Sequence, residues 1–306
     1  MNRTLGLCYA ALLMVTFTTH AWASDKQIKV IASIPDLADM AREIGGENIT
    51  VECMTTGVED IHAVAVRPSL AARLARADVL IELGLEAEHA WLPPLIDASN
   101  NVKINRVNRP GRIVASQGVT PKEVPLIVSR QEGEQHPSGN PHINVGPDMG
   151  RLMITNICHG LTAVAPDHKA FFEANLAKYL ARLDVKEQEW AAAGEKLKGV
   201  KCVSFHPDMI YLTDFLGMEQ LGTIEPKPGI PPSAGHITDL IKEMKQAGVK
   251  IIIREPQYSD KLPNEIATKT GAKVVKIAVM VGGRPEAKTW IETVDANIHA
   301  LLDAVQ

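Results

Sequence analysis

The chain has 306 residues, of which 45% are hydrophobic and 22% are charged. This composition is typical of a globular protein with room for about two domains, and it excludes a disordered chain, a collagen-like chain and a bare coiled coil. The formal net charge of −4 is spread without long basic runs, and aromatic residues make up only 4%. Nucleic-acid binding is therefore a poor hypothesis. Histidine is the unusual residue, with ten copies against four cysteines.

Residues 1–23 have the pattern of a secretory signal peptide. Arg3 supplies a positive charge, residues 5–19 are largely apolar, and Ala21-Trp22-Ala23 places small residues before a cleavage site ahead of Ser24. The apolar stretch is too short for a finished membrane-spanning helix, and no later segment reaches about 18 uninterrupted apolar residues. We therefore expect a soluble protein that is exported to the periplasm.

Residues 24–160 read as an N-terminal α/β lobe. Short apolar runs alternate with segments of helical periodicity. The expected strands lie at 28–33, 51–54 and 79–83, and the expected helices at 35–44 and 68–77, with a further helix that begins near Pro147. Repeated strand, helix and strand at these lengths predicts a parallel sheet with helices on its faces, because parallel neighbours need a crossover connection.

Residues 161–199 are dominated by one long helical pattern. It starts near Pro166-Asp167 and stops at Gly199, with apolar side chains spaced by three, four and seven residues. About 30 helical residues would form a rod of roughly 45 Å. The pattern alone fits a long surface helix of one large domain or a rigid connector between two lobes, and we favour the connector.

Residues 200–306 read as a C-terminal α/β lobe. The strand-and-helix alternation resumes, with strands expected at 200–205, 249–254 and 273–277 and helices at 209–216, 237–246, 262–270 and 289–304. The predicted fold class is therefore α/β, with two lobes that each hold a mostly parallel sheet flanked by helices, joined by one long rigid helix. The chain has no G-x-G-x-x-G, P-loop or G-x-S-x-G signature of nucleotide binding or serine hydrolysis.

Three histidines share one sequence context. His62, His142 and His206 each follow an apolar run or lie next to a proline, where a strand or turn would deliver the side chain to the rim of a lobe. In open α/β sheets, ligands gather outside the carboxyl ends of the strands. Three neutral imidazoles suit zinc, copper, nickel or iron, and they leave room for a carboxylate or water in a tetrahedral zinc site. Single histidines at such positions are more often simply hydrogen-bonded, so the trio by itself is a weak indication.

Five segments strengthen the hypothesis because of their order along the chain. They are residues 61–69 (IHAVAVRPS), 74–80 (LARADVL), 140–142 (NPH), 225–233 (EPKPGIPPS) and 253–259 (IREPQYS). In these segments the chain resembles the periplasmic zinc- or manganese-binding proteins of ABC metal importers, the cluster A-I solute-binding proteins, in their zinc-type branch. The resemblance covers essentially the whole chain after residue 23.

This resemblance implies a metal site in the cleft between the two lobes, with His62, His142 and His206 as ligands. The fourth ligand does not carry over directly. The family's aspartate position, four residues past the glutamate that matches Glu255, holds Ser259 here, and an aspartate follows one residue later. The candidates are therefore Asp260, which we expect first, and alternatively Glu255, Asp60 or a water molecule.

The expected cargo is Zn(II), because three imidazoles favour zinc whereas manganese-importing relatives tend to replace one histidine with a carboxylate. The expected function is high-affinity capture of a divalent transition metal in the periplasm and delivery to an ABC permease in the inner membrane, by a monomer and without enzymatic activity. We also consider a periplasmic metallochaperone as a second partner. The alternative functions are a secreted zinc-dependent hydrolase, or a manganese-binding or adhesin-type member of the same family.

The segment before His142 is short compared with the histidine-rich loop of many zinc-importing relatives. Residues 130–140 contain His136 as their single histidine. We therefore do not expect this segment to gather metal ions in general. His136 is instead expected to transfer or sense zinc. His89 is expected at the rim of the cleft rather than among the ligands.

Overall fold

The computed structural model describes residues 27–129, 133 and 135–306, so the predicted signal peptide lies outside the described residues. The N-terminal lobe is built on a parallel sheet with the strand order β2-β1-β3-β4. Its strands are β1 (Ile28–Ala32), β2 (Ile49–Cys53), β3 (Val79–Glu82) and β4 (Arg112–Val114). Its helices are α1 (Pro35–Gly45), α2 (Pro68–Leu74), α3 (Leu92–Ser99) and α4 (Gly150–Val164).

The C-terminal lobe repeats this topology, with the parallel order β6-β5-β7-β8. Its strands are β5 (Lys201–Ser204), β6 (Glu219–Thr223), β7 (Ile251–Arg254) and β8 (Lys273–Lys276), and its helices are α6 (Ile210–Phe215), α7 (Ala234–Ala247), α8 (Lys261–Thr270) and α9 (Trp290–Val305). In each lobe the second strand of the chain pairs with one side of the first strand, and the third strand pairs with its other side. This reversal opens a crevice at the carboxyl ends of β1 and β3, and of β5 and β7, where ligands bind in such sheets.

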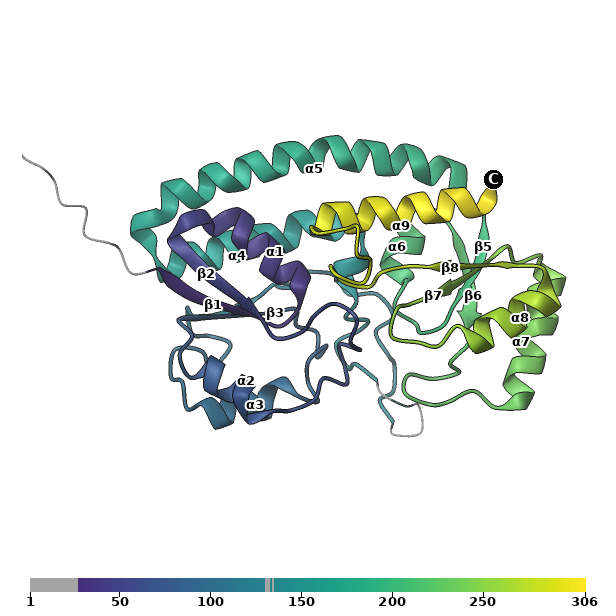
Figure 1. Ribbon diagram of the computed structural model, residues 1–306, viewed down its shortest axis with the longest axis horizontal. Coiled ribbons are helices and arrows are strands. Elements are labelled where there is room, and N and C mark those ends of the chain that lie inside the picture. Colours follow the sequence, from purple (N-terminus) through teal and green to yellow (C-terminus); the bar gives the residue numbers. More distant parts are fainter. Residues whose placement is uncertain (1–26, 130–132, 134) are drawn as a thin grey trace, which may run out of the picture.

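Helix α5 (Lys169–Leu197) spans both lobes and lies across their common side (Figure 1). Near its start, Asn175 Nδ2 donates a hydrogen bond of 3.0 Å to the carbonyl oxygen of Ile44 on α1. Near its end, Trp190 Nε1 donates one of 2.6 Å to Asp295 on α9. The predicted fold class, with two parallel-sheet lobes and one long linking helix, is confirmed. The helix begins at Lys169, close to the predicted start near Pro166-Asp167, and residues 161–164 of the expected segment belong to α4 instead.

One hydrophobic core runs through both lobes on the side of α5. Buried side chains from α1, α4, α5, α9 and both sheets form a single cluster, which includes Leu37, Ile81, Leu183, Ile251 and Trp290. The opposite face of each sheet has its own smaller cluster, under α2 and α3 in one lobe and under α7 and α8 in the other. The lobes therefore share packed side chains in addition to the helix that connects them.

Two strands and one helix are missing from the sequence-based prediction. Strand β4 has only three residues, and β6 has the sequence EQLGT with every residue at least partly exposed. Both lie at a sheet edge, where one side of the strand stays in solvent and strong apolar alternation is not required. Helix α3 starts with Leu-Pro-Pro, and prolines at the first turn are compatible with a helix because the missing N–H groups would lack intrahelical partners anyway.

Polar contacts from α1 join the two lobes. Asp36 Oδ2 accepts a hydrogen bond of 3.1 Å from the backbone N–H of Val281, and Asp39 Oδ2 accepts one of 2.8 Å from Trp290. Asn144 Nδ2 donates to the carbonyl oxygen of Val279 at 2.7 Å. Burial raises the pKa of Asp36 to about 7, although the hydrogen bond from Val281 opposes the shift. The carboxyl group at this joint is therefore easily protonated.

The loop that leads from β2 toward His62 packs closely against the backbone of the C-terminal lobe. Two positions of this contact have no room for a side chain. Gly57 has a φ of +97°, and a Cβ atom there would lie 1.9 Å from the carbonyl oxygen of Val281. Gly282 has a φ of +93°, and its Cβ atom would lie 2.5 Å from the carbonyl oxygen of Thr56. Two glycines thus permit the close backbone approach that holds this loop against the other lobe.

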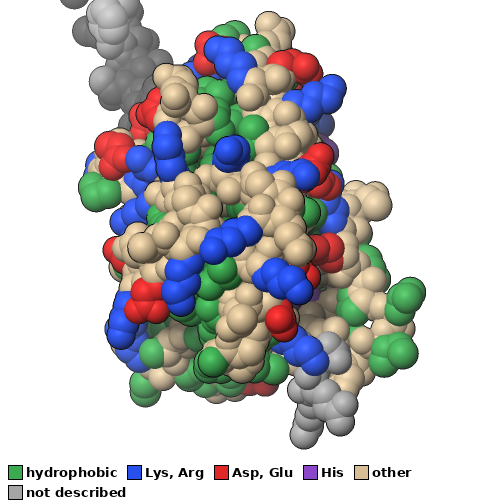
Figure 2. All heavy atoms as spheres, turned by 90° about the vertical axis from the view of Figure 1, so that its right-hand side faces the viewer, with side chains coloured by type: hydrophobic (Ala, Val, Ile, Leu, Met, Phe, Trp, Pro, Cys, Tyr) green, Lys and Arg blue, Asp and Glu red, His purple; other side chains and the backbone are tan. Residues whose placement is uncertain are grey.

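Basic and acidic side chains are interspersed on the end of the molecule formed by the C-terminal lobe (Figure 2). Across residues 27–129, 133 and 135–306, no helix combines the length and the apolar character needed to cross a membrane.

The raised pKa of Asp36 predicts a pH effect on folding. A carboxyl group that binds its proton more tightly in the folded state contributes stability at low pH, and this contribution is lost as the pH rises from about 4 through about 7. As the pH rises through this range, the wild type should lose stability and Asp36→Asn should not. The free energy of unfolding of the variant minus that of the wild type should therefore increase, by at most about 1.4 kcal/mol per pH unit. Urea denaturation at several pH values measures the difference. The exposed Asp97→Asn is the control, and a pH-independent difference for Asp36→Asn would contradict the prediction.

Candidate metal centre

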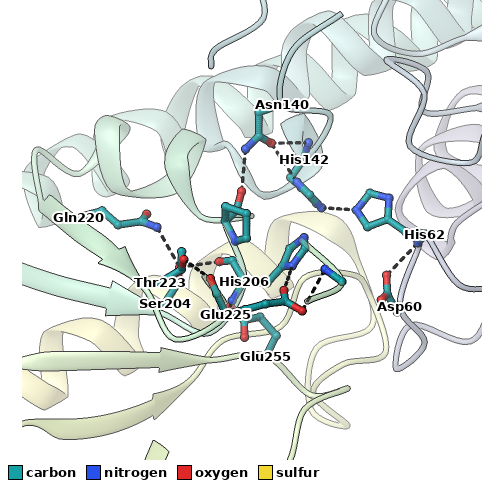
Figure 3. Close-up of polar contacts among 12 residues, drawn as sticks. Asp60, His62, Asn140, His142, Ser204, His206, Gln220, Thr223, Glu225 and Glu255 are labelled. Atoms are coloured by element: carbon teal, nitrogen blue, oxygen red, sulfur yellow. Dashed lines mark hydrogen bonds and ion pairs between the residues drawn. The ribbon is translucent and has the colours of Figure 1, made fainter. Parts of the chain in front are cut away.

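Three histidines from three different loops converge between the lobes (Figure 3). His62 lies between β2 and α2, His142 lies just before the turn Ile143–Val145, and His206 follows β5. Each side chain offers one ring nitrogen, and these three atoms lie within 4.8 Å of one another. The residues are only 4–5% exposed. The structure therefore brings together the three histidines that the sequence singles out.

An oxygen acceptor orients each imidazole by accepting a hydrogen bond from Nδ1. The acceptors are the carbonyl oxygen of Ala87 for His62, at 3.1 Å, and Asn140 Oδ1 for His142, at 2.9 Å. For His206 the acceptor is Glu225 Oε2, at 2.7 Å. Because none of these oxygens carries a hydrogen, the proton belongs to Nδ1 in each ring, and Nε2 is left with a lone pair. Metal-binding histidines are commonly fixed in this way.

Asn140 links the environments of two of the histidines. Its Oδ1 accepts from both the Nδ1 and the backbone N–H of His142, and the latter bond is 3.0 Å long. Its Nδ2 donates to Glu123 Oε2 at 2.8 Å and to the carbonyl oxygen of Pro207 at 2.7 Å. Pro207 directly follows His206, so one amide group fixes the orientation of His142 relative to the loop of the C-terminal lobe.

The arrangement of lone pairs calls for a cation. His62 Nε2 lies 2.9 Å from His142 Nε2. With both Nδ1 atoms protonated, two lone pairs face each other at this distance, which is repulsive unless a positive charge lies between or beside them. A divalent metal ion supplies such a charge, and imidazole nitrogen is a good ligand for it.

The surroundings keep two of the three rings neutral. Burial, reinforced by the neighbouring His206, lowers the pKa of His62 to about 3. Burial, reinforced by the neighbouring His62 and His206, places the pKa of His142 well below its usual value. Burial also disfavours the charged form of His206, but the hydrogen bond to Glu225 and nearby carboxylates outweigh it and raise the pKa of His206. His62 and His142 therefore each offer a lone pair without first releasing a proton. His206 is the ring at which a proton competes with a metal ion.

Two of the carboxylates expected as a fourth ligand, Asp260 and Asp60, have other partners in the structure, whereas Oε2 of Glu255 is buried without one. Asp260 forms an ion pair with Arg254, and its side chain is 61% exposed. Asp60 Oδ1 accepts from the backbone N–H of His62 at 2.8 Å, and Glu255 Oε1 faces the backbone N–H of His206 at 3.5 Å. The structure does not bring Asp260, the first candidate, to the three histidines: among the described residues, the ligand-forming group consists of the histidines alone.

Three polar residues of the centre were not identified from the sequence. They are Asn140, Asp208 and Glu225, each of which is at least 92% buried. Asn140 sits two residues before His142, a spacing at which an asparagine side chain commonly binds the backbone ahead, and this signal was available. Glu225 and Asp208 carry no comparable sequence signal, because their positions depend on how β6 and the loop after β5 pack. Burial and the neighbouring Glu255 carboxyl raise the pKa of Asp208.

A cavity of about 290 Å³ leads to the centre. Its lining includes His136, Asn140, His142, His206 and Lys227, which come from both lobes. This volume accommodates an ion and a few water molecules rather than a large organic molecule.

These features define a two-lobed α/β protein with a buried group of three histidines between its lobes that could hold a metal ion. Residues 30–304 match the family described as ZnuA, the periplasmic zinc-uptake complex component A. The chain belongs to this family, and the predicted resemblance to metal-binding solute-binding proteins of ABC importers is confirmed.

Individual relatives show how widely the family varies. The zinc-binding lipoprotein AdcA of Streptococcus pneumoniae is 22% identical over 97% of this chain, which spans 59% of the length of that protein. The iron-binding protein YfeA of Yersinia pestis is 22% identical over 90% of this chain and 86% of its own. A crystal structure of ZnuA is 27% identical, covers 92% of this chain and 100% of its own, and superimposes with a TM-score of 0.77.

The contact between Glu225 and His206 predicts an effect on metal affinity. Glu225→Gln removes the charged acceptor that orients the imidazole and increases its basicity, so zinc affinity should fall by about 10- to 100-fold while the fold is retained. Competition with a fluorescent zinc chelator measures the affinity, and circular dichroism checks the fold. The matched control is Glu243→Gln on the exposed face of α7. An unchanged affinity in Glu225→Gln would contradict the role of this hydrogen bond.

Proposed function

We propose that this protein captures Zn(II) in the periplasm through His62, His142 and His206 and delivers it to an ABC permease, without chemical conversion of any substrate. The observation that supports this most directly is the convergence of three buried imidazoles whose Nδ1 atoms are all committed to oxygen acceptors. Members of the family are metal-binding transport proteins rather than enzymes. Glu225, the carboxylate closest to His206, is engaged with that ring and with the backbone N–H of Gly229, so it is poorly placed as a base for zinc-dependent hydrolysis.

Zinc is the proposed cargo because of the donor set. Imidazole suits zinc and copper, whereas manganese favours carboxylate, carbonyl and water oxygen. Asp60, Asp260 and Glu225 are bound to a backbone N–H group, to Arg254 and to an imidazole ring, respectively. Among the described residues, the three histidines form a donor set of nitrogen alone. Copper(II) would bind such a site more tightly than zinc, so selection of zinc depends on tetrahedral geometry and on the metals available.

The remaining parts of the proposal concern location and partners. The signal-peptide pattern of residues 1–23 and the family description both support a periplasmic carrier. We propose an inner-membrane ABC permease as the recipient of the metal, and a monomer as the functional form. A periplasmic metallochaperone is a second proposed partner, which would load the site.

Alanine variants of the three histidines test the site. His62→Ala, His142→Ala and His206→Ala should each weaken zinc binding by more than about 100-fold, because loss of a direct ligand exceeds the effect of losing an outer partner. Equilibrium dialysis with zinc, in competition with manganese and copper, measures both affinity and selectivity. His299→Ala, an exposed residue of α9, is the control. Unchanged zinc binding in all three variants would overturn the site, and preferred retention of manganese would overturn the proposed cargo.

The shared core predicts how the metal is released. Helix α5, the common hydrophobic cluster and the contacts of Asp36 and Asn144 all join the lobes, so a large hinge motion would break packed contacts. We expect zinc removal to rearrange the loops around the histidines and to leave the separation of the lobes unchanged. Small-angle scattering of the loaded and metal-free protein tests this expectation. A clear increase in the radius of gyration on zinc removal would contradict it.

A further inference from the structure

A fourth histidine lies against the three at the centre. The ring centroid of His136 is 4.7 Å from that of His62, which is slightly closer than the 4.9 Å between His62 and His142. His136 also lines the cavity that leads to His142 and His206. From its sequence context, as the single histidine of a short polar segment, His136 is expected only to transfer or sense zinc.

The ring of His136 differs from the other three in its hydrogen bonding. Its Nδ1 is buried and has no hydrogen-bond partner, whereas Nδ1 of each of the other three donates to an oxygen. A buried nitrogen without a partner carries an energetic penalty, which coordination of a metal ion relieves.

The backbone around His136 is anchored to the N-terminal lobe. Ser138 donates from its backbone N–H and its Oγ to the two carboxylate oxygens of Glu86, at 3.1 and 2.6 Å. Gly139 donates to the carbonyl oxygen of His136 at 3.0 Å and closes a tight turn. These contacts keep the imidazole of His136 near His62, although it lies outside the group of nitrogens that are mutually within 4.8 Å. The ring of His136 must therefore move toward the three histidines to join them.

We propose that His136 supplies the fourth protein ligand, so that the bound metal is held by four imidazoles. Asp260 and Asp60 are bound to other groups, Glu255 does not lie among the three ring nitrogens, and His136 Nδ1 is a buried, unpartnered ring nitrogen of a residue that lines the cavity. Four nitrogen ligands complete a tetrahedron without a bound water and further disfavour manganese. The inference rests on the proposed function, since it concerns the same site.

Cobalt(II) provides a way to count the ligands, because its unpaired electrons shift the signals of coordinated rings far outside the normal range. A histidine that binds through one ring nitrogen shows one shifted, exchangeable N–H proton from the other. The cobalt-loaded full-length protein should therefore give four such signals in water that disappear in D₂O, and His136→Ala should give three. His89→Ala is the matched control, since the His89 ring lies 5.7 Å from that of His136 and His89 is not one of the proposed ligands.

Zinc release provides a second measurement. His136→Ala should still bind one zinc ion, but transfer to an excess of chelator should be at least about tenfold faster than in the wild type and in His89→Ala. Three shifted signals in the wild type, or no change of either measurement in His136→Ala, would overturn the proposal. That result, together with loss of zinc binding in His62→Ala, would leave the proposed function intact. Retention of zinc by His62→Ala would instead overturn the proposed function itself.

Discussion

The structure depends on holding neutral imidazoles with their lone pairs directed at one point. Neutral rings that face each other in this way repel, as the 2.9 Å separation of His62 Nε2 and His142 Nε2 illustrates. Rotation of either ring would relieve the repulsion, so the surrounding protein must prevent it. An oxygen acceptor on each Nδ1 does so, and each acceptor is itself fixed by backbone structure or by further hydrogen bonds.

The fold explains how the three imidazole rings are kept in their positions. The two lobes share the same strand order, and β5 delivers His206 at the crevice of the C-terminal sheet. The loop with His62 crosses the opposite lobe at Gly57 and Gly282, where no side chain would fit. A common hydrophobic core and α5 then fix the spacing between the lobes. The cleft is therefore a preformed site, and the cost of organising the ligands is met during folding rather than during metal capture.

The acidic side chains near the three histidines lie around the group of ring nitrogens rather than within it. Glu225 lies behind His206, while Asp208 and Glu255 are buried beside the same loop with raised pKa values. Burial raises the pKa of Glu255 to about 7, so this carboxyl group loses its proton reluctantly. A nitrogen-lined cavity with its carboxylate in an outer position suits an ion that favours imidazole over oxygen ligands. The same arrangement increases the basicity of His206 toward that ion.

The sequence by itself determined the α/β alternation, the long connecting helix and the three histidines, because each of these depends on local periodicity or on residues next to a strand end. The edge strands β4 and β6 could not be predicted, since half-exposed strands lack a strong apolar pattern. Only the tertiary structure decided that Asp260 pairs with Arg254, that Glu225 orients His206, and that His136 lies against His62. The last two contacts join residues 19 and 74 positions apart, and chain proximity gives no information about them. The number of histidines pointed to a metal site, and the packing of the two lobes decided which of them lie together.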